Sequence, residues 1–498
     1  MAIELVASRL IAQHVGTNLY TWTSIIAVVL AGISLGNVLG GIVADRVHAE
    51  GTARVAAWTL IASGLFALAS VLVVDPVFVS ANASQASLPV RILVGVTLSF
   101  FLPAVVLGSV SPLAATWAIT ANERLGTTVG GLYAFSSVGA IAGTLLTGFV
   151  LISLFGSIVI MAGVALTLTL SSLLVRRTWT TVLGVAFVAS MAVVVAIGGW
   201  GAVTSPAAAS EAGNVIYASE TRYQTVVVSW DPQRRTRTVM LDNLVHGFVV
   251  PEEPRVLLYP YIAVYAAAYE VLRDTLDEEN VSSLHLGGGA FTLPRYIAEA
   301  FPTDEIIVSE IDPGVTEANH VATRLPRPPP FELHHLDARA VVRQLAAEGR
   351  SVGVVFADAF GHYSIPAHLT TAEFYAEVDA ILDDGGVVLQ NVIDDFRFPR
   401  MLASIVATIQ SAHPYVTVFL PMTGEGGLAR NTFVVASSHA PIDEASIVAR
   451  LAAMGLPVEI LDADAIFAAI APLAPIVLTD AFAPVERLVL HLYNDTAQ

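Results

Sequence analysis

The chain contains neither cysteine nor lysine. The absence of cysteine excludes disulfides, thiolate metal sites and thiol nucleophiles. The absence of lysine excludes a Schiff base with a carbonyl substrate and the phosphate-binding lysine of a P-loop. Positive charge is scarce as well, because the 24 arginines are outweighed by 42 acidic residues and leave a net charge of -18. No nucleic-acid partner is expected, since phosphate contacts need basic patches.

Apolar residues are in excess, at 55% of the 498 residues. The excess lies in residues 1–199, where six runs are long enough to span a bilayer. A short amphipathic helix over 3–15, lying on the membrane or on the bundle, precedes them. The runs cover about 20–43, 55–74, 91–118, 127–154, 157–175 and 179–199. We therefore expect an integral membrane protein, with the lipid bilayer as one partner.

Two features of these runs concern their packing and their role. Pro103 and Pro112 predict a kink or break in the third run. Gly32, Gly36 and Gly40 share one helix face, as do Gly139 and Gly143 in the fourth run, and this spacing favours close helix packing over a substrate path. The runs hold almost no ionisable residues, so a pump or ion-coupled transporter is not expected.

The orientation in the membrane is ambiguous from the sequence. The arginines between the runs all fall on one side of a six-span arrangement, which the positive-inside rule makes cytoplasmic. They are Arg46, Arg54, Arg124, Arg176 and Arg177. An even number of spans then puts the rest of the chain on the other side. The glycine-rich stretch described below predicts a site for a nucleotide, and nucleotides are found in the cytosol. On these chemical grounds we expect the rest of the chain in the cytoplasm.

The pattern changes to that of an α/β domain after a small, polar linker at 200–213. Residues 214–255 predict a β-hairpin subdomain, and a helix at about 256–276 follows it. In 256–498 helical segments alternate with strands near 281–286, 305–310, 331–336, 352–358, 385–391, 415–420 and 431–437. This alternation predicts a mostly parallel sheet covered on both faces, with the last two strands as an antiparallel hairpin at its edge.

The stretch from Leu284 to Asp312 carries the strongest functional signal. Gly287, Gly288 and Gly289 follow an apolar strand and precede a helix, whose free N–H groups suit a polar or anionic ligand. Glu310 ends the next strand, at about the 20-residue spacing of an acid that binds ribose hydroxyls. The combination predicts a nucleotide site rather than an ordinary tight turn.

Two aspartates end later strands of the same sheet. Asp337 ends FELHHLD, where it could cap the next helix or accept a hydrogen bond from a base amino group. Asp358 ends VGVVFAD, and a carboxylate facing a cleft there could act as a general base, because partial burial raises its pKa. The alternative for Asp358 is to cap the following loop. His362 and Tyr363 in that loop could line a substrate pocket.

The remaining histidines of this region give no metal signal. His285 lies within an apolar strand and is expected to be a core residue. His334 and His335 have no companion at metal-ligand spacing except each other, so no metal is predicted.

Several segments resemble the spermidine synthases, whose members transfer an aminopropyl group from decarboxylated S-adenosylmethionine to an amine. They are SETRYQTVVV, LDNLVHG, LGGGAFTLPRYIAEAFP, VSEID, HLDA, FADAF and APIVLTDAFAPVERL. The whole chain resembles the bacterial proteins in which such a domain is fused to a major-facilitator-like membrane region. The resemblance implies a Rossmann-like sheet of the class I methyltransferase type after an α-helical membrane bundle.

The resemblance also implies roles for individual residues. Nucleotide contacts are implied for Gln224, for the three glycines, for Glu310 at the ribose, and for Asp337 with Ala338 at the adenine. Asp358 corresponds to the proton acceptor. Substrate contacts are implied for Asp242 and Tyr259, and the hairpin region implies a homodimer by analogy.

Three positions depart from the family pattern. Ala290 and Gly361 stand where the family has aspartates, and Pro260 stands where a histidine follows the tyrosine. A polyamine is a polycation whose pocket needs carboxylates, so these losses weaken the amine half of the site. Three functions remain open: an aminopropyltransferase with altered amine specificity, a methyltransferase that uses ordinary S-adenosylmethionine, or a membrane sensor without catalysis.

Overall fold

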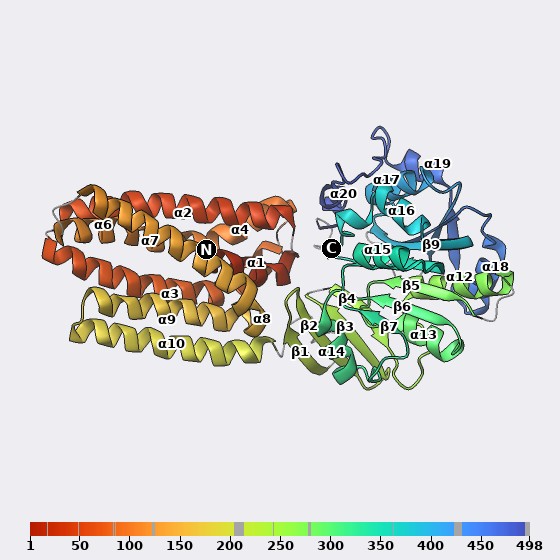
Figure 1. The fold of residues 1–498 in the computed structure, drawn as a ribbon, viewed down its shortest axis with the longest axis horizontal. Helices are drawn as coiled ribbons and strands as arrows, with labels where there is room; N and C mark the ends of the chain where they lie inside the picture. Colours follow the sequence, from red (N-terminus) through yellow and green to blue (C-terminus); the bar gives the residue numbers. More distant parts are fainter. Residues whose placement is uncertain are drawn as a thin grey trace. The chain divides into compact units, whose positions relative to one another are not determined.

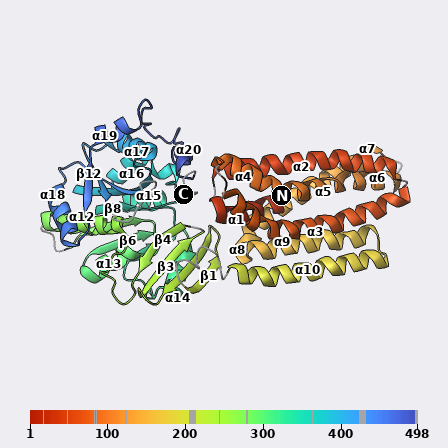
Figure 2. The ribbon, with the colours of Figure 1, turned by 180° about the vertical axis from the view of Figure 1, so that it is seen from behind.

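The computed structural model describes residues 1–16, 18–47, 49–82, 84, 86–121, 125–203, 214–242, 244–276, 280–361, 363–422 and 431–493. By its internal contacts the chain divides into two units, a helical one formed by its N-terminal part and an α/β one (Figure 1, and from behind in Figure 2). Most of the predicted linker, residues 204–213, lies outside the described residues.

The helical unit begins with α1 (Ala2–Val15). It continues with α2 (Leu19–Arg46), α3 (Ala49–Asn82), α4 (Leu88–Val96), the π-helical segment η1 (Thr97–Phe101), α5 (Leu102–Gly108), α6 (Val110–Ala121), α7 (Leu125–Leu145), η2 (Leu146–Leu151), α8 (Ile152–Leu154), α9 (Ser157–Val175) and α10 (Trp179–Val203). Among the described residues, six helical segments are long and apolar enough to cross a membrane. They match the six predicted runs. Helix α1 buries Val6, Leu10 and Ile11 and contacts α2, α3 and α9, so it packs on the bundle.

The proline-containing run is interrupted as predicted, since η1 separates α4 from α5 immediately before Pro103. The glycine stripe of α2 faces this irregular segment. A Cβ at Gly32 would overlap Ala104, and one at Gly40 would overlap Ser109 and Pro112. Close packing therefore explains the first stripe. Gly139 and Gly143 differ, because a Cβ there would meet nothing within 4 Å in the described part of the chain.

The α/β unit starts with a four-stranded antiparallel sheet rather than a single hairpin. Its strands are β1 (Asn214–Glu220), β2 (Thr225–Asp231), β3 (Thr236–Leu241) and β4 (Leu244–Val249), in that order. Asp242, in the turn between β3 and β4, is bonded to the first residue of β2. Its N–H donates to the Thr225 carbonyl oxygen, and its carboxylate accepts from the Thr225 N–H. Val226, Val228 and Val239 belong to the hydrophobic core that also contains residues of the larger sheet.

The larger sheet has eight strands in the order β12-β10-β11-β9-β8-β5-β6-β7. The strands are β5 (Ser282–Leu286), β6 (Glu305–Ser309), β7 (Glu332–His334), β8 (Val352–Ala357), β9 (Leu382–Asp394), β10 (Tyr415–Pro421), β11 (Asn431–Ser438) and β12 (Val458–Leu461). Strands β5 to β9 pair in parallel, whereas β11 runs antiparallel between β9 and β10. This is the strand order of the class I methyltransferase sheet.

The sheet departs from the sequence prediction at one edge. The antiparallel hairpin of β10 and β11 forms as predicted, but it does not end the sheet. Strand β11 lies inside, because it pairs with β9 from Asn431↔Asp394 to Ser438↔Val387. The edge is β12, a strand of four residues that pairs with β10.

Nine α-helices connect or follow these strands in the described part of the unit. They are α12 (Pro260–Leu276), α13 (Thr292–Ala300), α14 (Pro313–Ala322), α15 (Ala338–Glu348), α16 (Ala372–Asp379), α17 (Arg400–Gln410), α18 (Glu444–Ala453), α19 (Ala463–Ala469) and α20 (Val485–Leu488). The sequence of the α12 region carries a stripe of four tyrosines, Tyr259, Tyr261, Tyr265 and Tyr269, which predicts core packing or, as the alternative, part of a pocket wall. Core packing is confirmed for Tyr265 and Tyr269, which are buried against Phe356 of β8.

Candidate active site

Four of the predicted site segments lie at the carboxyl ends of the parallel strands of the larger sheet. Strands β5, β6, β7 and β8 are parallel, so their carboxyl ends point the same way. Gly287, Glu310, Asp337 and Asp358 follow those ends directly or within a few residues. From β5 the chain adds β6 and β7 on one side of the sheet and then crosses to add β8 and β9 on the other side. Ligands of such sheets bind beyond the strand ends at this switch point, here between β5 and β8.

The glycine turn packs against the strand ends on both sides. Gly287 has a positive φ of 106°, which side chains rarely adopt, and an added Cβ would lie 2.5 Å from the carbonyl oxygen of Asp358. At Gly288 an added Cβ would lie 2.8 Å from Oε2 of Glu310. Gly287 thus leaves room for the backbone of Asp358, and Gly288 leaves room for the Glu310 carboxylate and the Phe291 ring.

The carboxylate of Glu310 is held by backbone donors. Its Oε2 accepts from the N–H groups of Gly288 at 2.9 Å and Gly289 at 3.3 Å, and its Oε1 accepts from that of Asp312 at 2.9 Å. A carboxylate offers about four acceptor positions, so about one remains for a ligand hydroxyl, and the long bond from Gly289 is the easiest to exchange. Burial raises the pKa of Glu310 to about 7, although these N–H groups act in the opposite direction.

The carboxylate of Asp358 is oriented by two side chains. Asn391 donates to Oδ1 from its Nδ2 at 2.7 Å, and the Tyr261 hydroxyl donates to Oδ2 at 2.9 Å. Asp358 is densely surrounded yet half-buried, so a ligand can reach it. Burial raises its pKa to about 6, with both hydrogen bonds acting in the opposite direction. A carboxylate with a pKa near neutral pH is suited to accept a proton.

Tyr261 belongs to the tyrosine stripe for which the sequence allowed either core packing or a place in a pocket wall, whereas Asn391 was not singled out from the sequence. Asn391 lies where β9 passes the end of β8, because Ala357 pairs with Gln390. Its Oδ1 is buried and has no hydrogen-bond partner among the residues that the structure describes. The available signal was a polar residue at the end of a predicted apolar strand (385–391), the same signal that identified Glu310 and Asp358.

The predicted substrate residues fall into two groups. Tyr259 lies near Asp358 and Tyr363. Burial is the main cause that raises the pKa of Tyr259, and electrostatic repulsion from these two neighbours raises it further. Its ring also packs on Phe248 of β4, at 5.1 Å between centroids. Asp242 instead fixes the small sheet through Thr225, as described above, and its substrate role stays a prediction.

Gln224 lies directly before β2 of the small sheet. Its carbonyl oxygen accepts a hydrogen bond from the Thr221 N–H, and its nucleotide role stays a prediction. His362 lies outside the described residues.

Asp337 caps α15, one of the two roles considered for it. Its Oδ1 accepts from the N–H groups of Arg339 at 3.0 Å and Ala340 at 3.3 Å, while Ala338 begins the helix. Oδ2 lies 2.8 Å from Nε2 of His368 at a partly exposed position. A carboxylate whose second oxygen faces only an exposed imidazole remains able to accept from a ligand amino group.

The two positions that lack the family's aspartates differ in the space around them. Ala290 is 2% exposed, and a Cβ at Gly247 of β4 would lie 2.6 Å from the Cβ of Ala290. Gly361 is exposed, and the nearest atom to an added Cβ is the Ser364 carbonyl oxygen at 3.9 Å. A side chain can therefore be added at Gly361, whereas Ala290 is buried with its Cβ close to Gly247 of β4.

The remaining histidines are placed as follows. His285 is buried against Phe356, as predicted for a core residue, and burial lowers its pKa to about 3. His334 and His335 contact different partners, Glu332 and Thr316 respectively. These two do not form a shared metal site.

No family model matches the chain. The α/β part is similar to a polyamine aminopropyltransferase of Vibrio vulnificus, with 28% identity over 141 residues, which is 28% of this chain and 45% of that protein. It is also similar to a polyamine aminopropyltransferase of Pyrobaculum calidifontis, with 24% identity over 216 residues, which is 41% of this chain and 70% of that protein. The match thus spans less than half the length of the first relative. A crystal structure of a probable spermidine synthase from Corynebacterium glutamicum superposes with a TM-score of 0.45 and 20% identity, covering 53% of this chain and 95% of that one.

The fold and the arrangement of strand ends define an α/β domain of the methyltransferase type with an acidic, half-buried site. The C-terminal half of the chain is homologous to the polyamine aminopropyltransferases, the family of the spermidine synthases, and it follows a region of six long apolar helices.

Proposed function

We propose that the protein is a membrane-anchored aminopropyltransferase that moves an aminopropyl group from decarboxylated S-adenosylmethionine to an amine. One observation carries the proposal: the backbone of Asp358 packs against Gly287, its carboxylate is oriented by Tyr261 and Asn391, and the next glycine, Gly288, donates to Glu310. A proton acceptor and a site for ribose hydroxyls are therefore adjacent, as a reaction between an amine and an adenosyl sulfonium requires.

The residues at the strand ends fit such a co-substrate. Glu310 can accept from ribose hydroxyls. Asp337 caps α15 with Oδ1 and can accept from the adenine amino group with Oδ2. The buried Oδ1 of Asn391 is an acceptor still without a partner in the described structure. When bound, decarboxylated S-adenosylmethionine supplies an activated carbon next to a sulfonium leaving group. The chain then holds the amine near Asp358, and Asp358 Oδ takes the proton that the amine nitrogen loses.

A methyltransferase is the second candidate, and it is favoured by the positions of Ala290 and Gly361. Both lack the carboxylates that would offset the charge of a polyamine, and Ala290 is buried against β4. In that case the same nucleotide site holds ordinary S-adenosylmethionine and the acceptor is not a polycation. A membrane sensor that binds the nucleotide without catalysis is the third candidate.

Calorimetric titration of the purified, detergent-solubilised protein distinguishes these candidates. We expect decarboxylated S-adenosylmethionine to bind more tightly than the ordinary form, because the aminopropyltransferase reaction uses only the former. Tighter binding of the ordinary form would favour the methyltransferase. Binding without turnover of any of several amines would favour the sensor.

Restoring a carboxylate at position 361 is expected to strengthen the use of diamines. In Gly361→Asp the new side chain has room, and a second carboxylate near Asp358 would attract a cationic amine. We expect KM for putrescine-like diamines to fall by about 5- to 10-fold, a gain of about 1 kcal/mol for a partly exposed charge pair. Steady-state kinetics measures this, with Gly361→Asn as the neutral control. An equal fall of KM in both variants would show that charge is not the cause.

The surroundings of the domain are part of the proposal. The six apolar helices anchor the chain in the bacterial cell membrane, and the chemistry of the co-substrate places the α/β domain in the cytoplasm. A homodimer through the small sheet is proposed by analogy with the family.

A further inference from the structure

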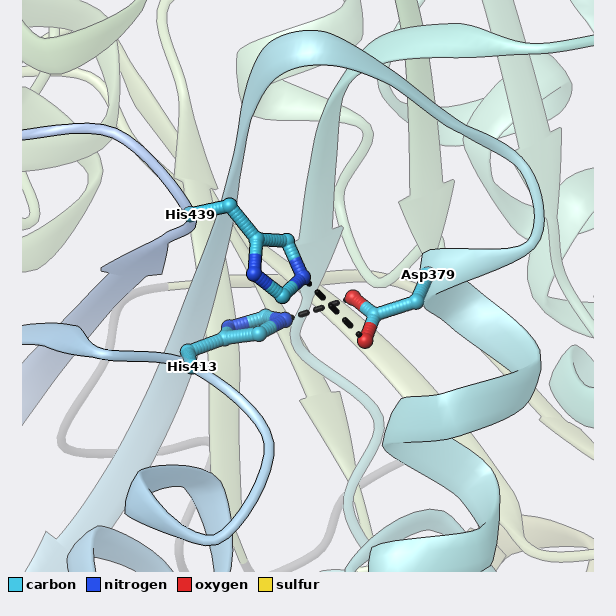
Figure 3. Close-up of side chains that lie close together, drawn as sticks. All are labelled: Asp379, His413 and His439. Carbon is cyan, nitrogen blue, oxygen red and sulfur yellow. Dashed lines mark hydrogen bonds and ion pairs between the residues drawn. The ribbon is translucent and has the colours of Figure 1, made fainter.

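Two histidines and an aspartate meet at the end of the larger sheet opposite the proposed active site. Figure 3 shows Asp379 at the end of α16 with His413 and His439 turned toward its carboxylate. His413 lies just before β10 and His439 just after β11. The pair Ser438↔Val387, next to the cluster, lies three residues along β9 from the pair Ala357↔Gln390, which is about 10 Å from the level of Ala357, the residue before Asp358. The cluster is therefore separate from the nucleotide site.

The ligand-type atoms of the cluster converge on one point. Nε2 of His413 lies 2.6 Å from Oδ1 of Asp379, and Nε2 of His439 lies 3.4 Å from Oδ2. One such atom from each residue lies within 4.8 Å of the other two. Around a tetrahedral metal with bonds of about 2.0–2.1 Å, ligand atoms are about 3.3 Å apart, so small side-chain rotations suffice to bind one ion.

The surroundings of His413 orient its ring for coordination. The ring is fully buried, and its Nδ1 lies 2.7 Å from the Ser437 hydroxyl. In the tautomer whose Nδ1–H donates to that hydroxyl, the Nε2 lone pair faces the carboxylate of Asp379 and is available to a metal ion, whereas in the other tautomer Nε2–H donates to the carboxylate. A metal-bound histidine whose other nitrogen is fixed by an outer hydrogen bond has this arrangement.

We propose that Asp379, His413 and His439 bind one divalent metal ion, with zinc as the best fit. Two imidazole nitrogens and one carboxylate oxygen suit zinc, and the chain has no thiolate to compete for it. His439 is 55% exposed, which leaves a fourth position open to water. The ion ties the end of α16 to the segments that flank β10 and β11, which are far apart in the sequence.

This proposal departs from the sequence prediction of no metal. That prediction considered spacing along the chain, and the three ligands lie on segments that only the fold brings together. The role of the ion is structural, because no residue of the proposed active site takes part in the cluster.

The test uses the untagged full-length protein in detergent, stripped with a chelator and then dialysed against zinc. Elemental analysis is expected to find about one zinc per chain. His439→Ala should reduce the zinc content to background without loss of fold, because this side chain is mostly exposed. Asp379→Asn should weaken zinc binding at least about 10-fold. Zinc should also raise the melting temperature of the wild type but not that of His439→Ala.

A matched control is His334→Ala, since His334 also pairs with a carboxylate, that of Glu332, but belongs to no such cluster. We expect this variant to keep the wild-type zinc content. Cobalt in place of zinc should give visible absorption bands that His439→Ala lacks. The proposal fails if the wild type binds no zinc at equimolar concentration, or if His439→Ala and His334→Ala bind it equally.

Discussion

Replacing Asp358 with asparagine is expected to lower kcat by about 100- to 10,000-fold, the range of a lost general base. Asn391 can still donate to the new carbonyl oxygen, and the Tyr261 hydroxyl can accept from the new amide instead of donating. The fold and the nucleotide affinity should therefore stay close to those of the wild type. Calorimetry for binding and initial-rate assays for turnover separate the two effects.

The pH profile gives a second readout for Asp358. A base must be deprotonated to act, and burial sets the pKa of Asp358 at about 6. The kcat of the wild type should rise as the pH increases through about 6, and the residual activity of Asp358→Asn should lack this limb. Asp384→Asn serves as the control, because Asp384 is an exposed aspartate at the start of β9. Wild-type turnover in Asp358→Asn would remove Asp358 as the proton acceptor.

Replacing Glu310 with alanine is expected to weaken nucleotide binding at least about 100-fold. Hydrogen bonds to a charged group contribute about 1.5–3 kcal/mol each, and the ribose offers two hydroxyls. Alanine also leaves the N–H groups of Gly288, Gly289 and Asp312 without their acceptor, so the turn itself is disturbed. Calorimetric titration with the nucleotide measures the combined loss.

Glu310→Gln separates the two contributions. Its amide oxygen can still accept from the glycine turn, but it carries no charge, so its affinity should lie between those of the wild type and Glu310→Ala. The pKa of Glu310 is about 7, so wild-type affinity should weaken as the pH falls below about 7, and Glu310→Gln should not show this dependence. Glu305→Gln, at the other end of β6 in an exposed ion pair with Arg350, is the matched control. Equal affinities in Glu305→Gln and Glu310→Gln would contradict the ribose role.

Much of the fold was predictable because it rests on local patterns. The long apolar runs gave the helices of the first unit, and the alternation of strands and helices gave the sheet from β5 to β11. The strands that the sequence did not predict are short and form by pairing with a neighbouring strand. Strand β12 has four residues and forms only because β10 offers it an unpaired edge. Likewise, Leu244–Val249 becomes a fourth strand of the small sheet by pairing with β3.

The candidate site was predictable only in part, for a related reason. Gly287, Glu310 and Asp358 stand at the ends of apolar strands, so the sequence marks them one by one. Asn391 carries the same mark at the end of a predicted strand and Tyr261 lies in a helix, but their contacts with Asp358 span 33 and 97 residues respectively. No spacing rule along the chain connects them.

The sequence by itself determined the apolar helices, the alternation of strands and helices, and the glycine turn with its acid, because each depends on residues near one another in the chain. Tertiary structure alone decided which side chains orient Asp358, that Ala290 is buried against β4, and that Asp379, His413 and His439 meet. The physical reason is that a strand periodicity fixes which residues point to a face, whereas the pairing of strands fixes which residues from distant segments lie next to them.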